Sequence, residues 1–189
     1  LVFRVQRRQT PMPDLERLTT EYIPLEDRIR LTGQVSDERV VTLWVTQRML
    51  SLLLPHLFDW LDKTAKKSAK ATKARDKSIS NIVQTFAQEA AVSALLKQDQ
   101  TPVKSQNNQT ELLINSIDIT SGDIGIRIGF KSESAHEDYR LINLTMEHEP
   151  LRQWLHILYT QSRQGDWTLR CWPDWMTETE EQTSKVSAH

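Results

Sequence analysis

The amino-acid sequence predicts an α+β fold in which antiparallel strands form meanders covered by amphipathic helices. Three observations predict this class. Apolar residues make up 38% of the 189 residues, which is typical of a globular chain. Several short segments alternate apolar and polar residues with a period of two, as strands do. Other segments repeat apolar residues every three or four positions, as helices do.

Two strands are predicted near the start of the chain and are expected to pair as a hairpin. From 27 to 33, Ile29 and Leu31 alternate with polar or charged residues, which is typical of a half-buried strand. Residues 40–45 are β-branched or aromatic, which favours a second strand after the turn-prone residues 36–38. A further short strand, suited to a sheet edge, is expected at 1–8.

Two amphipathic helices are predicted to follow the hairpin. Thr46 is expected to cap the first, because its hydroxyl can accept a hydrogen bond from an amide one turn later. Pro55 predicts a kink or a restart in this helix, because proline removes a helical hydrogen bond. The second helix is expected from 79 to about 97. The leucines that recur on one face of the first helix are Leu50, Leu53, Leu54, Leu57 and Leu61.

Three more strands and a helix are predicted beyond a polar stretch. Residues 112–119, 124–130 and 139–145 are each expected to form a strand, and a turn at 121–123 joins the first two. The last helix is expected to start at Pro150, because proline suits the first helical position, and to end at Gly165.

This order of elements divides the chain into two halves of one domain. The N-terminal half covers 1–98 and the C-terminal half, with its tryptophan-rich end, covers 111–176. A polar connector at 99–110 separates them, and a frayed acidic tail follows at 177–189. Both halves have the order strand, strand, helix, so two pseudo-repeated units are a hypothesis for the fold.

Composition excludes several classes of protein. The chain has 24 Lys and Arg residues against 25 Asp and Glu residues, so any attraction to nucleic acid would come from local clustering. Its single cysteine, Cys171, excludes an internal disulfide framework and favours a reducing, cytoplasmic location. The most apolar segment, 49–61, is shorter than the ~20 residues that span a membrane, so no membrane association is expected.

A lysine-rich segment at 63–77 is a candidate nucleic-acid-binding surface. If the first helix continued through it, its lysines would form one stripe that could contact successive phosphates. The alternative is a solvated helix or a flexible connector that the lysines keep soluble. The lysines concerned are Lys63, Lys66, Lys67, Lys70, Lys73 and Lys77.

Trp167, Trp172 and Trp175 are the candidate residues for binding a protein partner. They stand close together near the end of a chain that has six tryptophans. Such large rings can anchor a protein partner or stack on unpaired bases. They can equally fold back and complete the chain's own core, so these alternatives stay open at this stage.

No pattern of residues points to catalysis. His136 and His148 stand beside carboxylates, but neither has a second histidine at the helical spacing that holds zinc. Cys171 has a cationic neighbour, Arg170, that could lower its thiol pKa, but no local base. We therefore predict no enzymatic activity, no metal, no cofactor and no small-molecule ligand.

The sequence thus predicts a non-enzymatic protein-interaction, scaffold or regulatory module that self-associates, with a homodimer as the expected form. Self-association is expected because the leucines, Phe58 and Trp60 of the first helix cover more of its surface than one sheet needs. The alternative is a nucleic-acid-binding protein that uses the lysine-rich segment and exposed aromatic rings.

Overall fold

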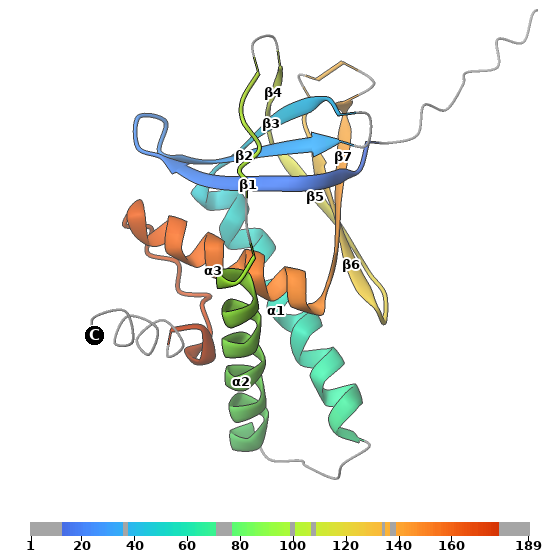
Figure 1. Cartoon of the computed structure of the whole chain (residues 1–189), viewed down its shortest axis with the longest axis vertical. Helices are drawn as coiled ribbons and strands as arrows, with labels where there is room; N and C mark the ends of the chain where they lie inside the picture. Colours follow the sequence, from blue (N-terminus) through green and yellow to red (C-terminus); the bar gives the residue numbers. More distant parts are fainter. Residues whose placement is uncertain are drawn as a thin grey trace, which may run out of the picture.

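The computed structural model describes residues 13–35, 38–70, 77–98, 101–106, 109–133, 135–136 and 139–177, with the side chains of 68–70 and 77–80 left out. The described elements form two sheets and a set of helices, which confirms the α+β class. Figure 1 shows one sheet across the top of the molecule and the other upright at its right side. The strand predicted at 1–8 lies outside the described residues.

The first sheet has the strand order β1-β2-β3-β4. Its strands are β1 (Leu15–Ile23), β2 (Arg28–Val35), β3 (Val40–Val45) and β4 (Thr110–Leu113). The predicted hairpin is confirmed, because β2 and β3 pair antiparallel. Strand β1, which the sequence analysis missed, pairs antiparallel with β2. Strand β4 joins from the second half of the chain and runs parallel to β3.

The second sheet has the order β5-β6-β7 and is antiparallel throughout. Its strands are β5 (Ser116–Ser121), β6 (Gly125–Lys131) and β7 (Leu141–Glu147). The turn predicted at 121–123 is confirmed by the amide of Gly122, which donates to the Gly125 carbonyl at 2.9 Å.

The single strand predicted at 112–119 is wrong, because the chain changes sheets in the middle of it. The amide of Ile114 donates to the carbonyl of Trp44 in the first sheet, at 3.0 Å. The amide of Asn115 donates to Lys131 in the second sheet, at 3.1 Å. The apolar residues shift phase here: Ile114 is followed by Ile117, three positions on, so one strand could not bury both on the same face.

Helices α1 (Gln47–Lys70) and α3 (His148–Gln164) cover the sheets, and α2 (Lys77–Leu96) packs against these two helices. The predicted cap is confirmed, because Thr46 Oγ1 accepts from the Met49 amide at 3.3 Å. A restart at Pro55 is wrong: α1 is continuous, and Pro55 lies in it as an exposed residue. A short helical turn, 174–177, follows the tryptophan-rich segment.

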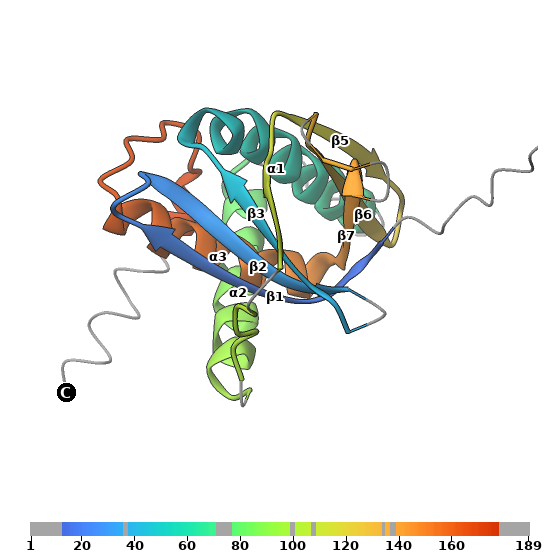
Figure 2. The same cartoon turned by 90° about the horizontal axis from the view of Figure 1, so that it is seen from above.

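Both sheets and helices α1 and α3 contribute to one hydrophobic core. Side chains from several of these elements are at most 1% exposed: Ile29 and Leu43 of the first sheet, Phe130 of the second, Leu54 of α1 and Leu151 of α3. Helices α1 and α3 both lie beneath the first sheet, as Figures 1 and 2 show. The two halves therefore share their core, while an internal duplication of strand-and-helix units stays a hypothesis.

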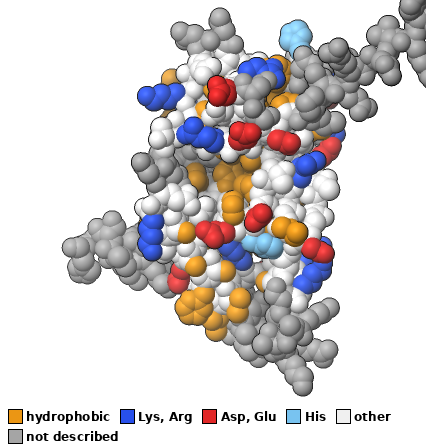
Figure 3. All heavy atoms as spheres, turned by 45° about the vertical axis from the view of Figure 1, so that its right-hand side comes forward, with side chains coloured by type: hydrophobic (Ala, Val, Ile, Leu, Met, Phe, Trp, Pro, Cys, Tyr) orange, Lys and Arg blue, Asp and Glu red, His pale blue; other side chains and the backbone are white. Residues whose placement is uncertain are grey.

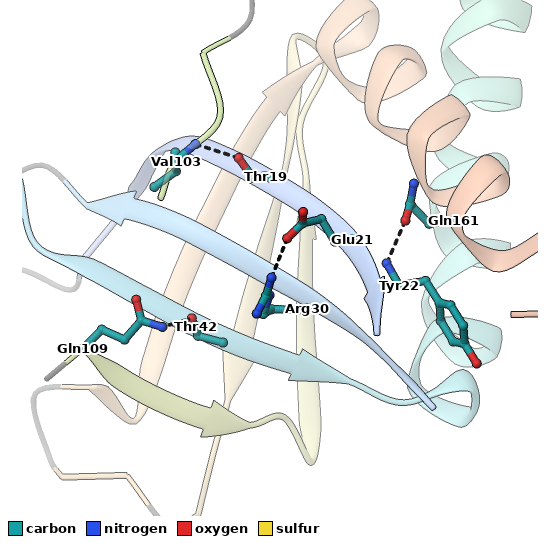
Figure 4. Close-up of polar contacts among 8 residues, drawn as sticks. All are labelled: Thr19, Glu21, Tyr22, Arg30, Thr42, Val103, Gln109 and Gln161. Carbon is teal, nitrogen blue, oxygen red and sulfur yellow. Dashed lines mark hydrogen bonds and ion pairs between the residues drawn. The ribbon is translucent and has the colours of Figure 1, made fainter. Parts of the chain in front are cut away.

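The connector between the halves is attached to the first sheet where the structure describes it. The amide of Val103 donates to Thr19 Oγ1 at 2.8 Å, and Gln109 Nε2 donates to Thr42 Oγ1 at 2.8 Å (Figure 4). On the other side, the edge of β1 meets β7, where the amide of Asn143 donates to the Pro13 carbonyl at 3.0 Å. The sheets thus touch at β1 and β7, whereas β5 lies at an outer edge.

Among the described residues, none of the helices has the length and apolar character needed to cross a lipid bilayer.

Candidate functional site

A groove of about 860 Å³ runs between α1 and β5. On the helix side its wall is the face formed by residues spaced three and four apart. On the strand side it is lined by the residues of β5 that face the helix and by the segment that enters β5. The lining residues include Arg48, Met49, Leu52, His56, Asp59, Trp60 and Lys63 of α1, and Asn115, Ser116, Ile117, Ile119 and Ser121.

Helix α1 and strand β5 run in the same direction along this groove. At one end, the Ile114 amide donates to the Trp44 carbonyl, which places the entry to β5 beside the start of α1. At the other end, Trp60 Nε1 donates to the Gly122 carbonyl at 2.9 Å. Figure 2 shows α1 and β5 side by side when the molecule is seen from above. The groove therefore has two distinguishable ends.

The outer edge of β5 carries backbone groups that no described strand pairs with. The Gly122 amide donates to Gly125, and β5 pairs with β6 without a register shift from Ser116 to Ser121. In an antiparallel pair the bonded residues alternate. Asp118 and Thr120 therefore direct their amide and carbonyl groups at β6, and Ile117, Ile119 and Ser121 direct theirs outward. An edge of this kind can accept another strand.

The groove is apolar near the start of α1 and polar toward its other end. Leu52 is 55% exposed there, and Met49, Ile117 and Ile119 are half-buried beside it. Farther along, the same face of α1 carries His56, Asp59 and Lys63, and β5 ends at Ser121. An apolar side chain is expected to lose water most favourably in the first part of the groove.

The charged side chains around the groove form ion pairs at its polar end, whereas Arg48 at its apolar end has no such partner among the described residues. At the polar end, Lys63 Nζ lies 2.6 Å from Asp59 Oδ2, and Lys67 Nζ lies 2.6 Å from Asp123 Oδ1. The pKa of Asp123 is lowered by the hydrogen bond and charge of Lys67. At the apolar end, exposed Arg48 makes no side-chain ion pair or hydrogen bond with other described residues.

A smaller recess of about 480 Å³ lies between the start of α1 and the segment after α3. Arg48 lines both the groove and the recess, and Arg170, also exposed, lines the recess from the segment after α3. Two guanidinium groups therefore stand at this end of the site.

Below the polar end of the groove, Trp60 stacks on His148, with ring centroids 4.4 Å apart and planes inclined by 23°. Burial lowers the pKa of His148 below its ordinary value of 6.5, and the charge of Arg152 lowers it further, whereas Glu147 opposes the shift. The unfolded chain therefore binds a proton at His148 more readily than the folded chain does. The free energy of unfolding is consequently highest above pH 6.5 and decreases as the pH falls below this value.

We expect the melting temperature to fall between pH 7 and pH 5, and to fall less in the variant His148→Gln than in the native chain. Thermal unfolding followed by circular dichroism at the two pH values measures both effects. An identical pH dependence in the two proteins would contradict this role of His148.

The lysine-rich segment is not one helical stripe, because α1 ends at Lys70 and α2 begins at Lys77. Lys63 and Lys67 are in the ion pairs described above, and Lys66 is exposed. The side chains of Lys70 and Lys77, and all of Lys73, lie outside the described part. Nucleic-acid binding by these lysines stays a prediction.

The candidate partner-binding tryptophans lie against the chain's own core. Trp167 and Trp175 are 7% and 4% exposed, and Trp172 is half-buried. Trp167 Nε1 donates to Asp27 Oδ1 at 2.8 Å, and this bond is the largest cause of the lowered pKa of Asp27. Trp172 and Trp175 both meet Phe58 edge-on, at 5.7 and 5.8 Å. These contacts favour the self-packing alternative, and partner binding by the three rings stays a prediction.

A second exposed apolar group lies on α2. Ile82, Val83 and Phe86 are 52%, 53% and 67% exposed, and Ile82 and Val83 each lie about one helical turn before Phe86. Figure 3 shows hydrophobic side chains gathered on the lower part of the molecular surface, over α2. This face is a candidate surface for the predicted self-association, which stays a prediction.

The residues considered for catalysis do not come together. No group of three or more His, Cys, Asp and Glu residues that could hold a metal ion occurs within the described ranges. Burial raises the pKa of the Cys171 thiol, the opposite of the shift that its cationic neighbour could have caused.

Comparisons of the chain with models of protein families, with curated protein sequences and with solved structures find no match.

Proposed function

We propose that this chain is a protein-interaction module that binds an extended peptide segment of a partner protein in the groove between α1 and β5. The segment adds to the second sheet as a fourth strand beside β5. The observation that carries the proposal is a groove, apolar at one end, that runs along an edge of β5 with which no described strand pairs. This role agrees in kind with the interaction module that the sequence predicts.

Backbone pairing supplies the first part of the binding. The outward amide and carbonyl groups of Ile117, Ile119 and Ser121 are spaced to pair with alternate residues of an added strand. With six residues in β5, the segment that pairs with it spans about 20 Å at ~3.3 Å per residue. Such pairing is independent of the partner's sequence, which is the general property of binding by strand addition.

Side chains of the partner supply the second part. In an added strand, every second side chain points to the same face of the sheet as Ile117 and Ile119, which face α1. There they would meet Met49 and Leu52 of the helix. The partner segment is therefore a stretch with aliphatic residues at alternate positions, and burial of Leu52 on binding removes an exposed leucine from water.

The proposal is tested by selecting binders from a random linear 12-residue peptide library displayed on phage, with the full chain as bait. The binders are expected to share alternating aliphatic residues. Fluorescence anisotropy then measures the dissociation constants of the selected peptides for the native chain and for variants.

Leu52→Glu is expected to weaken binding at least tenfold, because it removes an apolar contact of about 1.5–3 kcal/mol and introduces a charge. Leu25→Glu is the matched control: Leu25 is 98% exposed in the turn between β1 and β2, remote from the groove. It is expected to leave binding unchanged.

A second pair of variants tests the backbone contact. Ile119→Pro removes one outward amide, a position where a strand tolerates proline, and Ile119→Ala removes the same side chain but keeps the amide. The proline variant is expected to bind at least twofold more weakly than the alanine variant, since a hydrogen bond contributes about 0.5–1.5 kcal/mol. Selected peptides that bind all variants equally would contradict the proposal.

A further inference from the structure

The two ends of the groove differ in charge, and this difference defines which way a bound strand points. Strand β5 runs from Ser116, at the apolar end beside the start of α1, to Ser121, at the polar end beside Trp60. A strand added antiparallel to β5 therefore has its C-terminal end at the apolar end of the groove. Antiparallel addition continues the pattern of the existing sheet, and antiparallel pairs are slightly more stable per residue.

Two arginines lie at that end, and no acidic residue among those that line the groove lies beside them. Arg48 lines the groove and Arg170 lines the adjoining recess, and both are exposed. The one carboxylate among the groove-lining residues, Asp59, is at the other end and already pairs with Lys63. A guanidinium group is a strong donor to carboxylates, and Arg48 can bond one with two parallel N–H groups.

We infer that the partner segment is an extended peptide that runs antiparallel to β5 and carries acidic residues directly after its aliphatic stretch. The aliphatic residues lie against Met49, Leu52, Ile117 and Ile119, and the acidic residues lie at Arg48 and the recess beside it. This inference rests on the proposed function and adds the orientation and the charge of the partner.

Two labelled peptides of equal composition test the inference with the full chain. The first, GSVTVTVTEE, has its acids after the aliphatic stretch, and the second, EEVTVTVTSG, has them before it. Both carry an N-terminal fluorescein and a C-terminal amide, so that the peptides differ only in which end carries the two glutamates and which end carries the uncharged Gly-Ser pair. Fluorescence anisotropy measures their dissociation constants at 50 mM salt and at 500 mM salt.

The first peptide is expected to bind about fivefold more tightly than the second at 50 mM salt, the effect of an exposed ion pair of about 1 kcal/mol. This ratio is expected to shrink at 500 mM salt, because salt screens exposed charges. Arg48→Gln is expected to bring the ratio close to one while it changes the affinity for the second peptide less than twofold. Arg127→Gln is the matched control, since Arg127 is exposed on the opposite face of the second sheet.

The outcomes separate the two proposals. Equal binding of both peptides, or tighter binding of the second, overturns the inferred orientation and charge while strand addition stands, provided that Leu52→Glu weakens both. A preference that Arg48→Gln leaves intact also overturns the inference. If neither peptide binds the native chain, the proposed function itself is overturned together with the inference.

Discussion

Replacing Trp175 by alanine is expected to lower the free energy of unfolding by about 3–5 kcal/mol, the range for a buried aromatic residue cut to alanine. Trp175 is 4% exposed. Its ring meets Phe58 edge-on at 5.8 Å, and the guanidinium of Arg152 lies 5.3 Å from its centre. The variant thus loses buried apolar area, an aromatic contact and a cation–π contact together.

Urea unfolding followed by circular dichroism measures the Trp175→Ala effect. Trp172→Ala is the comparison: Trp172 touches Phe58 and Tyr159 but is only half-buried, so its loss is expected to be clearly smaller. If the free energy of unfolding of Trp175→Ala lies within about 0.5 kcal/mol of the native value, the range of neutral surface changes, the core role of Trp175 is contradicted. Partner binding would then be the better explanation for this ring.

Replacing Arg152 by alanine is expected to lower the free energy of unfolding by about 3 kcal/mol, because it leaves the buried acceptor Gln84 Oε1 without its partner and removes a buried side chain from the polar network. Arg152 is 7% exposed on α3. Its Nη2 donates to Gln84 Oε1, and Gln84 Nε2 donates to Asp62 Oδ1 at 3.0 Å. Burial lowers the pKa of Arg152 to about 10, with the charge of Asp62 acting in the opposite direction.

This network links α1, α2 and α3, so the effect of Arg152→Ala should reach α2 first. Hydrogen exchange of the α2 amides, measured by mass spectrometry, is expected to speed up in the variant. Arg170→Ala, at an exposed arginine on the same chain, is the matched control and is expected to stay within about 0.5 kcal/mol. Unchanged stability and unchanged exchange in Arg152→Ala would show that α2 does not depend on this network.

The α2 helix shows where local periodicity misleads. Its apolar spacing predicts a stripe buried in the core, yet Ile82, Val83 and Phe86 are exposed, while Gln84 and Gln88 are buried. Gln84 bonds Asp62 and Arg152, and Gln88 Nε2 donates to the Arg152 carbonyl at 3.0 Å. The buried face of α2 is thus chosen by polar partners on other elements, which a single segment does not reveal.

The apolar composition of α1 accounts for one wall of the groove. Leu50, Leu54 and Leu57 form the buried stripe, and Leu52 lies off it, as does Met49. The excess of apolar residues on this helix predicts self-association, yet its leucines, Phe58 and Trp60 are buried in the chain's own core, except Leu52, which lies in the groove. The sequence carried no sign that the facing wall would be the edge of a strand.

The sequence by itself determined the α+β class, the β2–β3 hairpin, the Thr46 cap and the last helix, because each follows from residues close together in the chain. Only the tertiary structure decided that the chain changes sheets at Ile114 and Asn115, that no described strand pairs with the outer edge of β5, and that Trp167 and Trp175 are buried. These features depend on which segments become neighbours, and strand order and burial are set by contacts between residues far apart in the sequence.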